Sequence, residues 1–299
     1  MATGTDQTLN APAVLLLGAS SQIGVFAIPQ LLLAGFRVLA VSRKGRPEGF
    51  PDFEPVDWLN EADAIQAAQT CQYLLSAGPL ELAKKILTTG THFQTAVIFS
   101  SSSVETKQRS FNSAERNQVQ DMLCLESDIQ VMAKSSGLKL VIFRPTLIYG
   151  CGLDTNISRL ANWIGRYGFM PVNGKAAGLR QPVHANDLAS VAITALLSKD
   201  ALPNVMFLTG GDTVSYSDMI KRIFTAMEKP AKLIRLPEWL FVLLVGFAGI
   251  SKISKGLNIE MVKRQRLDLV FDDRKARELL NYNPRPFAPT REDFSLPKF

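Results

Sequence analysis

The chain has 299 residues, of which 46% are hydrophobic and 20% charged, the balance of an ordinary globular protein. These values exclude disordered and fibrous classes and allow one large domain or a domain with a smaller companion. The net charge of +6 favours an anionic partner, but a mildly basic surface is the simpler interpretation. The basic residues are scattered without a nucleic-acid-binding motif, so we expect a phosphorylated small molecule and no nucleic acid.

Cysteine and histidine are scarce. Cys71, Cys124 and Cys151 are too few and too widely spaced for a disulfide framework or a metal site, so we expect reduced thiols, a cytoplasmic protein and no metal. Residues 1–12 are small and polar, typical of a flexible arm and not of a signal peptide. The longest apolar segment, Trp239–Ile250, is much shorter than the roughly 20 residues that a transmembrane helix needs.

The first predicted unit is a βαβ crossover. Ala13–Leu17 is a continuous apolar segment, typical of a strand that is covered on both faces. A Gly/Ser turn follows at 18–24, and then a helix to about Ala34 that ends at Gly35. A second strand is predicted over Arg37–Ser42, which gives the unit the length of one crossover.

The alternation of strands and helices continues to Gly150. A long helix is predicted over Ser113–Ser136, ending at Gly137. This order predicts an α/β fold, a Rossmann-like doubly wound parallel sheet with helices on both faces, over residues 13–150. Further strands are predicted over Phe53–Asp57, Gln72–Ser76, Thr95–Ser100 and Lys139–Phe143.

After Gly150 the loops are richer in glycine and proline. Helices are predicted over Asp187–Leu197, Ser217–Met227 and Pro237–Ile250, joined by short strands. We therefore expect residues 151–299 to form a smaller, mostly helical substrate domain, with some segments returning to the sheet.

The turn after the first strand is the expected cofactor site. Glycines there let the backbone approach a pyrophosphate, and the N-terminus of the following helix supplies N–H donors. Its position at the start of a βαβ unit favours dinucleotide binding over a chance Gly/Ser turn. The expected cofactor-binding residues of this turn are Gly18, Ser20, Ser21, Gln22, Ile23 and Gly24.

The end of the second strand decides between the two nicotinamide dinucleotides. An acidic residue there binds the ribose 2′-OH of NAD, whereas an arginine accommodates the 2′-phosphate of NADP. Here Ser42, Arg43 and Lys44 occupy the strand end, and no carboxylate follows them until Glu48. The sequence therefore favours NADP over NAD, with a solvated basic loop as the alternative.

Several segments, in this order and spacing, resemble motifs of one family. They are GASSQIG at 18–24, VD at 56–57, SSSSV at 100–104, RPTLIYG at 144–150, RQPVHANDLA at 180–189 and FDDRKARELL at 271–280. Together they are similar to the extended and atypical short-chain dehydrogenases/reductases of the NAD-dependent epimerase/dehydratase type. The resemblance covers most of the chain.

The resemblance implies roles for further residues. Ser102 matches a catalytic serine or threonine, with a helix- or turn-capping serine as the alternative. Arg180 matches a contact to a substrate diphosphate, or else is a surface arginine, and Tyr149 either contacts a ligand or packs against the sheet. His184 is expected to fix a loop. The other implied contacts are Asp57, Ala77, Gly78 and Pro145 for the cofactor and Ser103 for the substrate. The family resemblance implies that this substrate is a small molecule similar to a nucleotide sugar.

One departure from the family pattern concerns its Tyr-x-x-x-Lys pair. None of the five tyrosines, Tyr73, Tyr149, Tyr167, Tyr216 and Tyr282, has a lysine four residues later. Counting back from Gly137 places Met122 and Glu126 at the two positions. Nearby hydroxyls, Glu105 and Glu126 are then the groups that the sequence offers for proton transfer.

The expected function is therefore an NADP-dependent oxidoreductase or epimerase that acts on a nucleotide-sugar-like substrate. A non-catalytic NADP-binding sensor or complex-stabilising protein is the alternative that the missing pair favours. A reductase of a lipophilic substrate is a third hypothesis, based on the apolar segment Trp239–Ile250. A helix there would be apolar on all sides, so it is expected to pack in the core, against a membrane surface or against a second copy in a homodimer.

Overall fold

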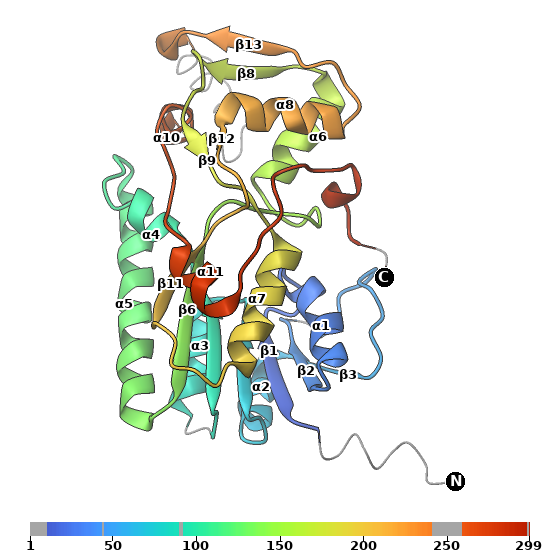
Figure 1. The fold of residues 1–299 in the computed structure, drawn as a ribbon, viewed down its shortest axis with the longest axis vertical. Coiled ribbons are helices and arrows are strands. Elements are labelled where there is room, and N and C mark those ends of the chain that lie inside the picture. Colours follow the sequence, from blue (N-terminus) through green and yellow to red (C-terminus); the bar gives the residue numbers. More distant parts are fainter. Residues whose placement is uncertain (1–10, 44, 90–91, 241–258, 298) are drawn as a thin grey trace.

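The computed structural model describes residues 11–43, 45–89, 92–240, 259–297 and 299. Its centre is a 7-stranded parallel sheet with the strand order β11-β6-β5-β4-β1-β2-β3 (Figure 1). The chain runs outward in one direction from β1 to β3 and then in the other from β4 to β11, as in a doubly wound Rossmann-like fold. The predicted α/β fold is confirmed.

The first six strands of this sheet lie close to the predicted segments, with one exception, and no segment was predicted for the seventh. The strands are β1 (Ala13–Leu17), β2 (Arg37–Val41), β3 (Val56–Leu59), β4 (Tyr73–Ser76), β5 (Thr95–Phe99), β6 (Lys139–Pro145) and β11 (Val205–Leu208). The exception is β3, which starts later than the predicted Phe53–Asp57. Pro55 has no N–H to donate to a ladder, and the ring of Phe53 packs against Phe50 and Phe299 instead.

Helices cover both faces of the sheet. Helices α1 (Gly24–Leu33) and α7 (Ala185–Leu197) pack against one another on one face, and α2 (Glu61–Ala68), α3 (Leu80–Thr88) and α5 (Ser113–Ser136) cover the other. Alternate side chains of each strand therefore enter different cores: Leu16 joins the α1 side, whereas Leu15 and Leu17 join the α5 side. Burial on both faces explains why these strands are continuously apolar.

The predicted boundaries of α5 are confirmed because local chemistry sets both of its ends. The side chain of Asn112 accepts a hydrogen bond from the backbone N–H of Ala114 at 2.9 Å, which caps the first turn. At the other end Gly137 adopts a left-handed conformation with φ of 71°, as expected of a glycine that terminates a helix. Gly35, with φ of 82°, follows the end of α1 in the same way.

A smaller lobe lies above the carboxyl edge of the sheet (Figure 1). One helix of this lobe, α6 (Ile157–Tyr167), was not among the predicted elements. The lobe has its own core, centred on Phe224 and Phe287. We call it the upper lobe, and it consists of α6 (Ile157–Tyr167), β8 (Met170–Asn173), β9 (Leu179–Arg180), β12 (Val214–Ser215), α8 (Tyr216–Ala226), β13 (Leu233–Leu236) and α10 (Ile259–Arg264).

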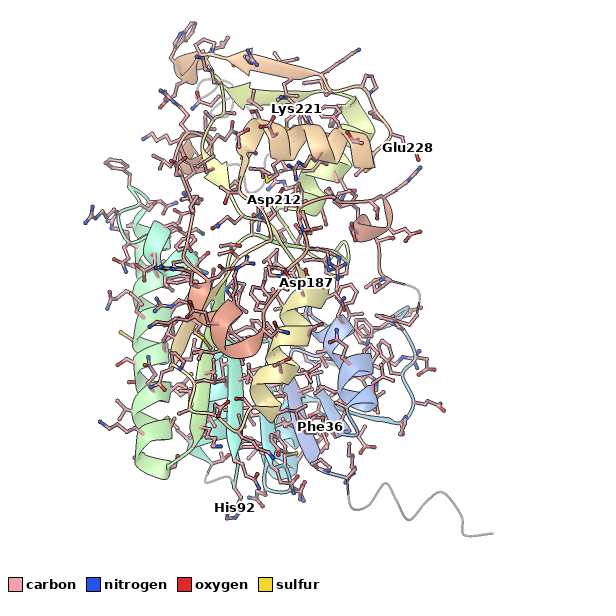
Figure 2. All side chains as sticks on the ribbon, in the orientation of Figure 1. Phe36, His92, Asp187, Asp212, Lys221 and Glu228 are labelled. Carbon is pink, nitrogen blue, oxygen red and sulfur yellow. The ribbon has the colours of Figure 1, made fainter. Side chains whose placement is uncertain are left out.

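Other segments after Gly150 return to the sheet. Strand β11 pairs with β6, and α11 (Arg274–Leu280) packs near β11 and α7. Between the two parts, β7 (Ile148–Tyr149) pairs with β10 (Val183–His184). Figure 2 shows Asp187 and Asp212 at this junction, where they form ion pairs with Arg285 and Arg222 respectively.

The apolar segment Trp239–Ile250 lies outside the described residues from 241 onward, as does the arm over residues 1–10. Residues 238–240 begin a helix, and Trp239 is exposed. Among the described residues no helix is both long and apolar enough to cross a membrane.

Gly150 yields a prediction about stability. Its φ is +125°, and a Cβ there would lie 2.5 Å from Nε2 of the buried His184. We expect Gly150→Ala to lower the free energy of unfolding by roughly 2–4 kcal/mol, the sum of backbone strain and a clash with a buried ring. Urea denaturation measures it.

The matched control is Gly168→Ala, because Gly168 has φ of +73° and no atom lies within 4 Å of the point where its Cβ would be. It reports backbone strain alone, roughly 1 kcal/mol. Equal losses in the two variants would show that the contact between Gly150 and His184 is not as described.

Candidate functional site at the carboxyl edge of the sheet

The turn between β1 and α1 is pressed against the segment that follows β4. The backbone N–H of Ser21 donates to the carbonyl of Gly18 at 2.8 Å, and the hydroxyl of Ser21 accepts from the N–H of Gly24 at 3.1 Å. A Cβ on Gly18 would lie 2.6 Å from the backbone of Ala77 and Gly78. The turn thus requires glycine where β1 and β4, neighbours in the sheet, both end.

The other glycine of the turn is equally constrained. A Cβ on Gly24 would lie 2.4 Å from the carbonyl oxygens of Gly18 and Ala19. Backbone at such short range cannot move aside as a flexible side chain can. These close contacts are made with the protein's own backbone, and the approach to a pyrophosphate stays a prediction. The remaining turn residues Ser20 and Ile23 lie between the two glycines, Ile23 being buried.

Two buried polar groups at this edge have no partner among the described residues. They are Oε1 of Gln22, in the turn, and the hydroxyl of Ser76, the last residue of β4. A buried polar group without a hydrogen bond costs roughly 1–3 kcal/mol. The fit to a polar ligand is therefore good: the edge has a backbone cradle that only glycine permits and polar atoms that remain to be satisfied.

The end of β2 presents a cation without an ion-pair partner among the described residues. Ser42 is buried, and its hydroxyl donates to the carbonyl of Gly45, which shapes the loop. The side chain of Arg43 is exposed and makes no ion pair with the described residues, whereas Arg46 pairs with Asp52 at 2.8 Å. Lys44 lies outside the described residues.

Asp57 is not at a strand end, contrary to the sequence prediction. It is the second residue of β3 and faces Leu39 of β2 in the ladder. Its carboxylate accepts from the guanidinium of Arg37 at 2.8 Å, and both side chains are about half exposed. The difference arises because β3 begins later than predicted and extends to Leu59.

Ser102 follows β5, where its backbone N–H donates to the carbonyl of Pro145 at 3.0 Å. It precedes the short helix α4 (Ser103–Thr106), but its side chain makes no capping hydrogen bond. The hydroxyl of Ser101 instead accepts from the N–H of Ser103 at 3.1 Å. The capping alternative for Ser102 is thus not what this structure has, and its hydroxyl has no partner among the described side chains.

Arg144, near the end of β6, holds two carboxylates. Its Nη2 lies 2.5 Å from Oε2 of Glu126, whose side chain is 2% exposed, and Nη1 lies 2.8 Å from Oε1 of Glu105, which is 46% exposed. The hydroxyl of Ser100 also donates to Glu126. Glu126 is therefore committed to a buried ion pair, and Met122, one turn earlier, packs against the apolar core on that face.

Tyr149 lies inside the protein. It is buried between the rings of His184 and Phe287, with centroids 5.0 Å and 4.9 Å away. Burial raises the pKa of its hydroxyl above the ordinary range. Of the two interpretations that the sequence allowed, packing is the one that these contacts describe.

Arg180 is a buried residue and not a surface arginine. Its Nη1 donates to the carbonyls of Leu179 and Leu267, each at 2.7 Å, and Nη2 donates to the carbonyl of Arg264. The guanidinium also lies over the ring of Tyr216 at 5.5 Å. Burial lowers its pKa. Arg180 thus ties the segment after α10 to β9.

His184 fixes a loop, as predicted. Its Nδ1 accepts from the N–H of Asn186 at 3.0 Å and caps α7, while Nε2 lies 3.1 Å from the carboxylate of Asp293. Burial by itself raises the pKa of Asp293, but hydrogen bonds from His184 and Thr290 outweigh it and hold that pKa below its usual value. These bonds join the C-terminal segment to the sheet.

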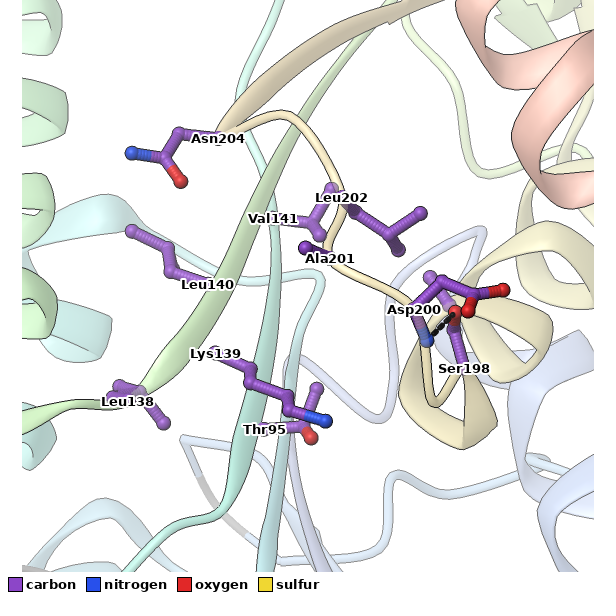
Figure 3. Close-up of a pocket in the computed structure, with 11 residues that line it drawn as sticks. Thr95, Leu138, Lys139, Leu140, Val141, Ser198, Asp200, Ala201, Leu202 and Asn204 are labelled. Atoms are coloured by element: carbon purple, nitrogen blue, oxygen red, sulfur yellow. Dashed lines mark hydrogen bonds between the residues drawn. The ribbon is translucent and has the colours of Figure 1, made fainter.

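A cavity of about 150 Å³ lies elsewhere, at the amino ends of β5 and β6 (Figure 3). Thr95, Lys139 and Asp200 are among the residues that line it. Because ligands of open α/β sheets bind outside the carboxyl ends of the strands, this cavity does not belong to the candidate site. No group of side chains among the described residues is arranged to hold a metal ion.

Comparison with known proteins places these features in context. No family model matches the chain. A UDP-glucose 4-epimerase from Vibrio cholerae is 26% identical over 159 residues, which is 53% of this chain and 46% of that protein. The chain thus matches about half the length of this curated relative.

Solved structures share the fold over nearly the whole chain. A UDP-glucuronic acid 4-epimerase from Bacillus cereus, in complex with UDP-glucuronic acid and NAD, has a TM-score of 0.68 at 16% identity, with 91% of this chain and 94% of that one covered. A UDP-glucose 4-epimerase from Thermotoga maritima, with UDP-glucose, has a TM-score of 0.65 at 14% identity, with 95% and 96% covered. A putative epimerase from Burkholderia cenocepacia has a TM-score of 0.72 at 14% identity, with 95% and 97% covered.

The fold and the glycine turn define the class of protein: a Rossmann-like protein with a candidate ligand site at the carboxyl edge of its sheet. Within that class, the resemblance to the extended short-chain dehydrogenases/reductases of the epimerase type is confirmed. Sequence reasoning missed the role of Arg144, although this residue opens the RPTLIYG motif. An arginine at the end of an apolar strand, with a glutamate on the preceding helix, was the available signal.

The central ion pair yields a prediction. Glu126→Ala would leave the guanidinium of Arg144 buried without its main partner, so we expect a loss of roughly 3–5 kcal/mol in the free energy of unfolding. Glu126→Gln keeps the shape and an acceptor and should lose less. Urea denaturation compares the two.

A surface ion pair on the same helix provides the control. Asp128 pairs with Lys84 at 2.7 Å, and both side chains are substantially exposed, so Asp128→Ala should cost no more than about 1 kcal/mol. A loss of that size for Glu126→Ala would contradict a buried pair.

Proposed function

We propose that this chain binds a nicotinamide dinucleotide at the carboxyl edge of its sheet and acts as an oxidoreductase or epimerase on a nucleotide-sugar-like substrate. The observation that carries the proposal is the Gly18–Gly24 turn, whose backbone lies against Ala77 so closely that no side chain fits at Gly18. The unpartnered oxygens of Gln22 and Ser76 support a polar ligand there. Similarity to a UDP-glucose 4-epimerase supports the substrate class.

Different residues of the chain would bind the cofactor and the substrate. The turn and the ends of β2, β4 and β6, with Ser42, Arg43, Ala77, Gly78 and Pro145, would hold the cofactor, which supplies hydride transfer when bound. Ser102, whose hydroxyl is unpartnered, would hydrogen-bond the substrate oxygen, with Ser103 beside it. For Tyr149 and Arg180, substrate contact stays a prediction, and it requires both side chains to leave the internal contacts described above.

The choice of dinucleotide rests on Arg43. Its guanidinium is exposed at the end of β2 and has no carboxylate partner among the described residues, which favours the 2′-phosphate of NADP. The similar structure from Bacillus cereus was solved with NAD. We propose NADP on the residues of this chain, and the two cofactors are compared directly in the test.

We expect the protein to bind NADPH at least about tenfold more tightly than NADH, because a charge-assisted hydrogen bond contributes roughly 1.5–3 kcal/mol. Arg43→Ala should remove most of this difference, as measured by fluorescence titration. Arg46→Ala is the control, since Arg46 pairs with Asp52, and it should leave the ratio unchanged. Tighter binding of NADH by the natural protein would overturn the NADP assignment, and no binding of either would overturn the site.

The absence of the Tyr-x-x-x-Lys pair has a kinetic consequence. General acid–base assistance typically contributes about 10²–10⁴-fold in rate, and Glu126 is held in an ion pair. We expect turnover of UDP- or GDP-sugars to be undetectable or at least about 100-fold below that of an epimerase with the full pair, measured by coupled assay. A rate equal to such an enzyme's, abolished by Ser102→Ala, would show that another group replaces the pair.

A specific observation favours a second candidate function, that of a non-catalytic dinucleotide-binding sensor or complex-stabilising protein. One of the two positions at which the family's pair was expected carries a packing methionine and the other an ion-paired glutamate. Tight dinucleotide binding without hydride transfer to any 4-keto sugar would favour this candidate.

A further inference from the structure

The cluster formed by Arg144, Glu105 and Glu126 contains one cation and two carboxylates. One guanidinium faces two carboxylates, and its Nε and Nη2 are both directed at Glu126. Because Glu126 is almost completely removed from water, this pair has to be neutral as a unit. Glu105, held only by Nη1, adds a negative charge that Arg144 does not cancel.

Glu105 lies three residues after Ser102, whose hydroxyl has no partner among the described residues. The backbone N–H of Glu105 donates to the carbonyl of Ser102 at 3.1 Å, so the two residues belong to one helical turn at the carboxyl end of β5. The bond from Arg144 restrains the Glu105 side chain, which is nevertheless 46% exposed. A restrained, half-exposed carboxylate thus belongs to the same helical turn as the proposed substrate-binding serine.

Two cations of the neighbouring elements are engaged by another carboxylate. Lys107, at the end of α4, and Arg264, from α10 of the upper lobe, both pair with Glu115 on α5. Glu115 also accepts a hydrogen bond from Ser110. These contacts give the seam between α5 and α10 a positive balance, while the Ser102 turn keeps its negative charge.

We propose that Glu105 is a specificity-determining residue of this site, selecting substrates whose sugar is neutral or carries an amino group over sugars that carry a carboxylate. The inference rests on the proposed function, because it takes the sugar to lie at Ser102. A carboxylate accepts hydrogen bonds from hydroxyl or ammonium groups, whereas like charges placed together oppose binding. Arg144 cannot reverse this preference, since Glu126 already uses two of its donors.

The experiment is a calorimetric titration, at low salt and with saturating NADPH, of the natural protein and Glu105→Gln. The ligands are UDP-glucose, UDP-glucuronic acid and UDP. We expect the natural protein to bind UDP-glucose at least about tenfold more tightly than UDP-glucuronic acid. Glu105→Gln should reduce this ratio at least about threefold by tightening the uronate, without changing the affinity for UDP, and salt should reduce it too.

The control variant is Glu228→Gln, which removes the same charge just beyond the end of α8 in the upper lobe (Figure 2), far from α4, the helix that follows Ser102 (Figure 1). It should leave the ratio unchanged, and thermal melting verifies that both variants fold. If UDP binds but the two sugars bind equally, or if Glu105→Gln leaves the ratio unchanged, the selectivity inference is wrong while the proposed function stands. If neither UDP nor UDP-glucose binds, the proposed function itself is overturned, and the inference with it.

Discussion

A guanidinium and a carboxylate that have lost nearly all contact with water must remain together, because separating them would leave a buried charge uncompensated. Arg144 on β6 and Glu126 on α5 form such a pair, and Ser100 after β5 adds a third contact. Two strands and a helix are thereby locked at the carboxyl edge of the sheet. The same pair engages the carboxylate of Glu126 inside the protein.

The other half of the edge is governed by backbone approach. Gly18 and Gly24 bring main-chain atoms within distances that exclude any side chain, and the parallel arrangement of β1 and β4 brings their ends together. A cradle of this kind suits a phosphate-bearing ligand because helix N–H groups point into it. It is also compatible with the fold shared with UDP-sugar epimerases, although the active-site pair of that family has no counterpart here.

Buried polar residues stabilise the upper lobe and the C-terminal segment. Arg180 holds the carbonyls of residues 264 and 267, and His184 connects α7 to Asp293 near the C-terminus. Both residues come from one motif of the sequence, and both are engaged inside the protein. The motif therefore supports the architecture that shapes the site, whatever its ligand contacts are.

The sequence by itself determined the elements that depend on local chemistry. Apolar continuity marked the buried strands, and Asn112 and Gly137 set the ends of α5, since capping involves only neighbouring residues. The glycine turn between β1 and α1 was also predictable, because a tight turn depends on neighbouring residues. The tertiary structure decided what depends on residues far apart: the later start of β3, the pairing of Arg144 with Glu126 and the burial of Arg180. Such partners are selected by how helices and strands pack, and no local pattern encodes that.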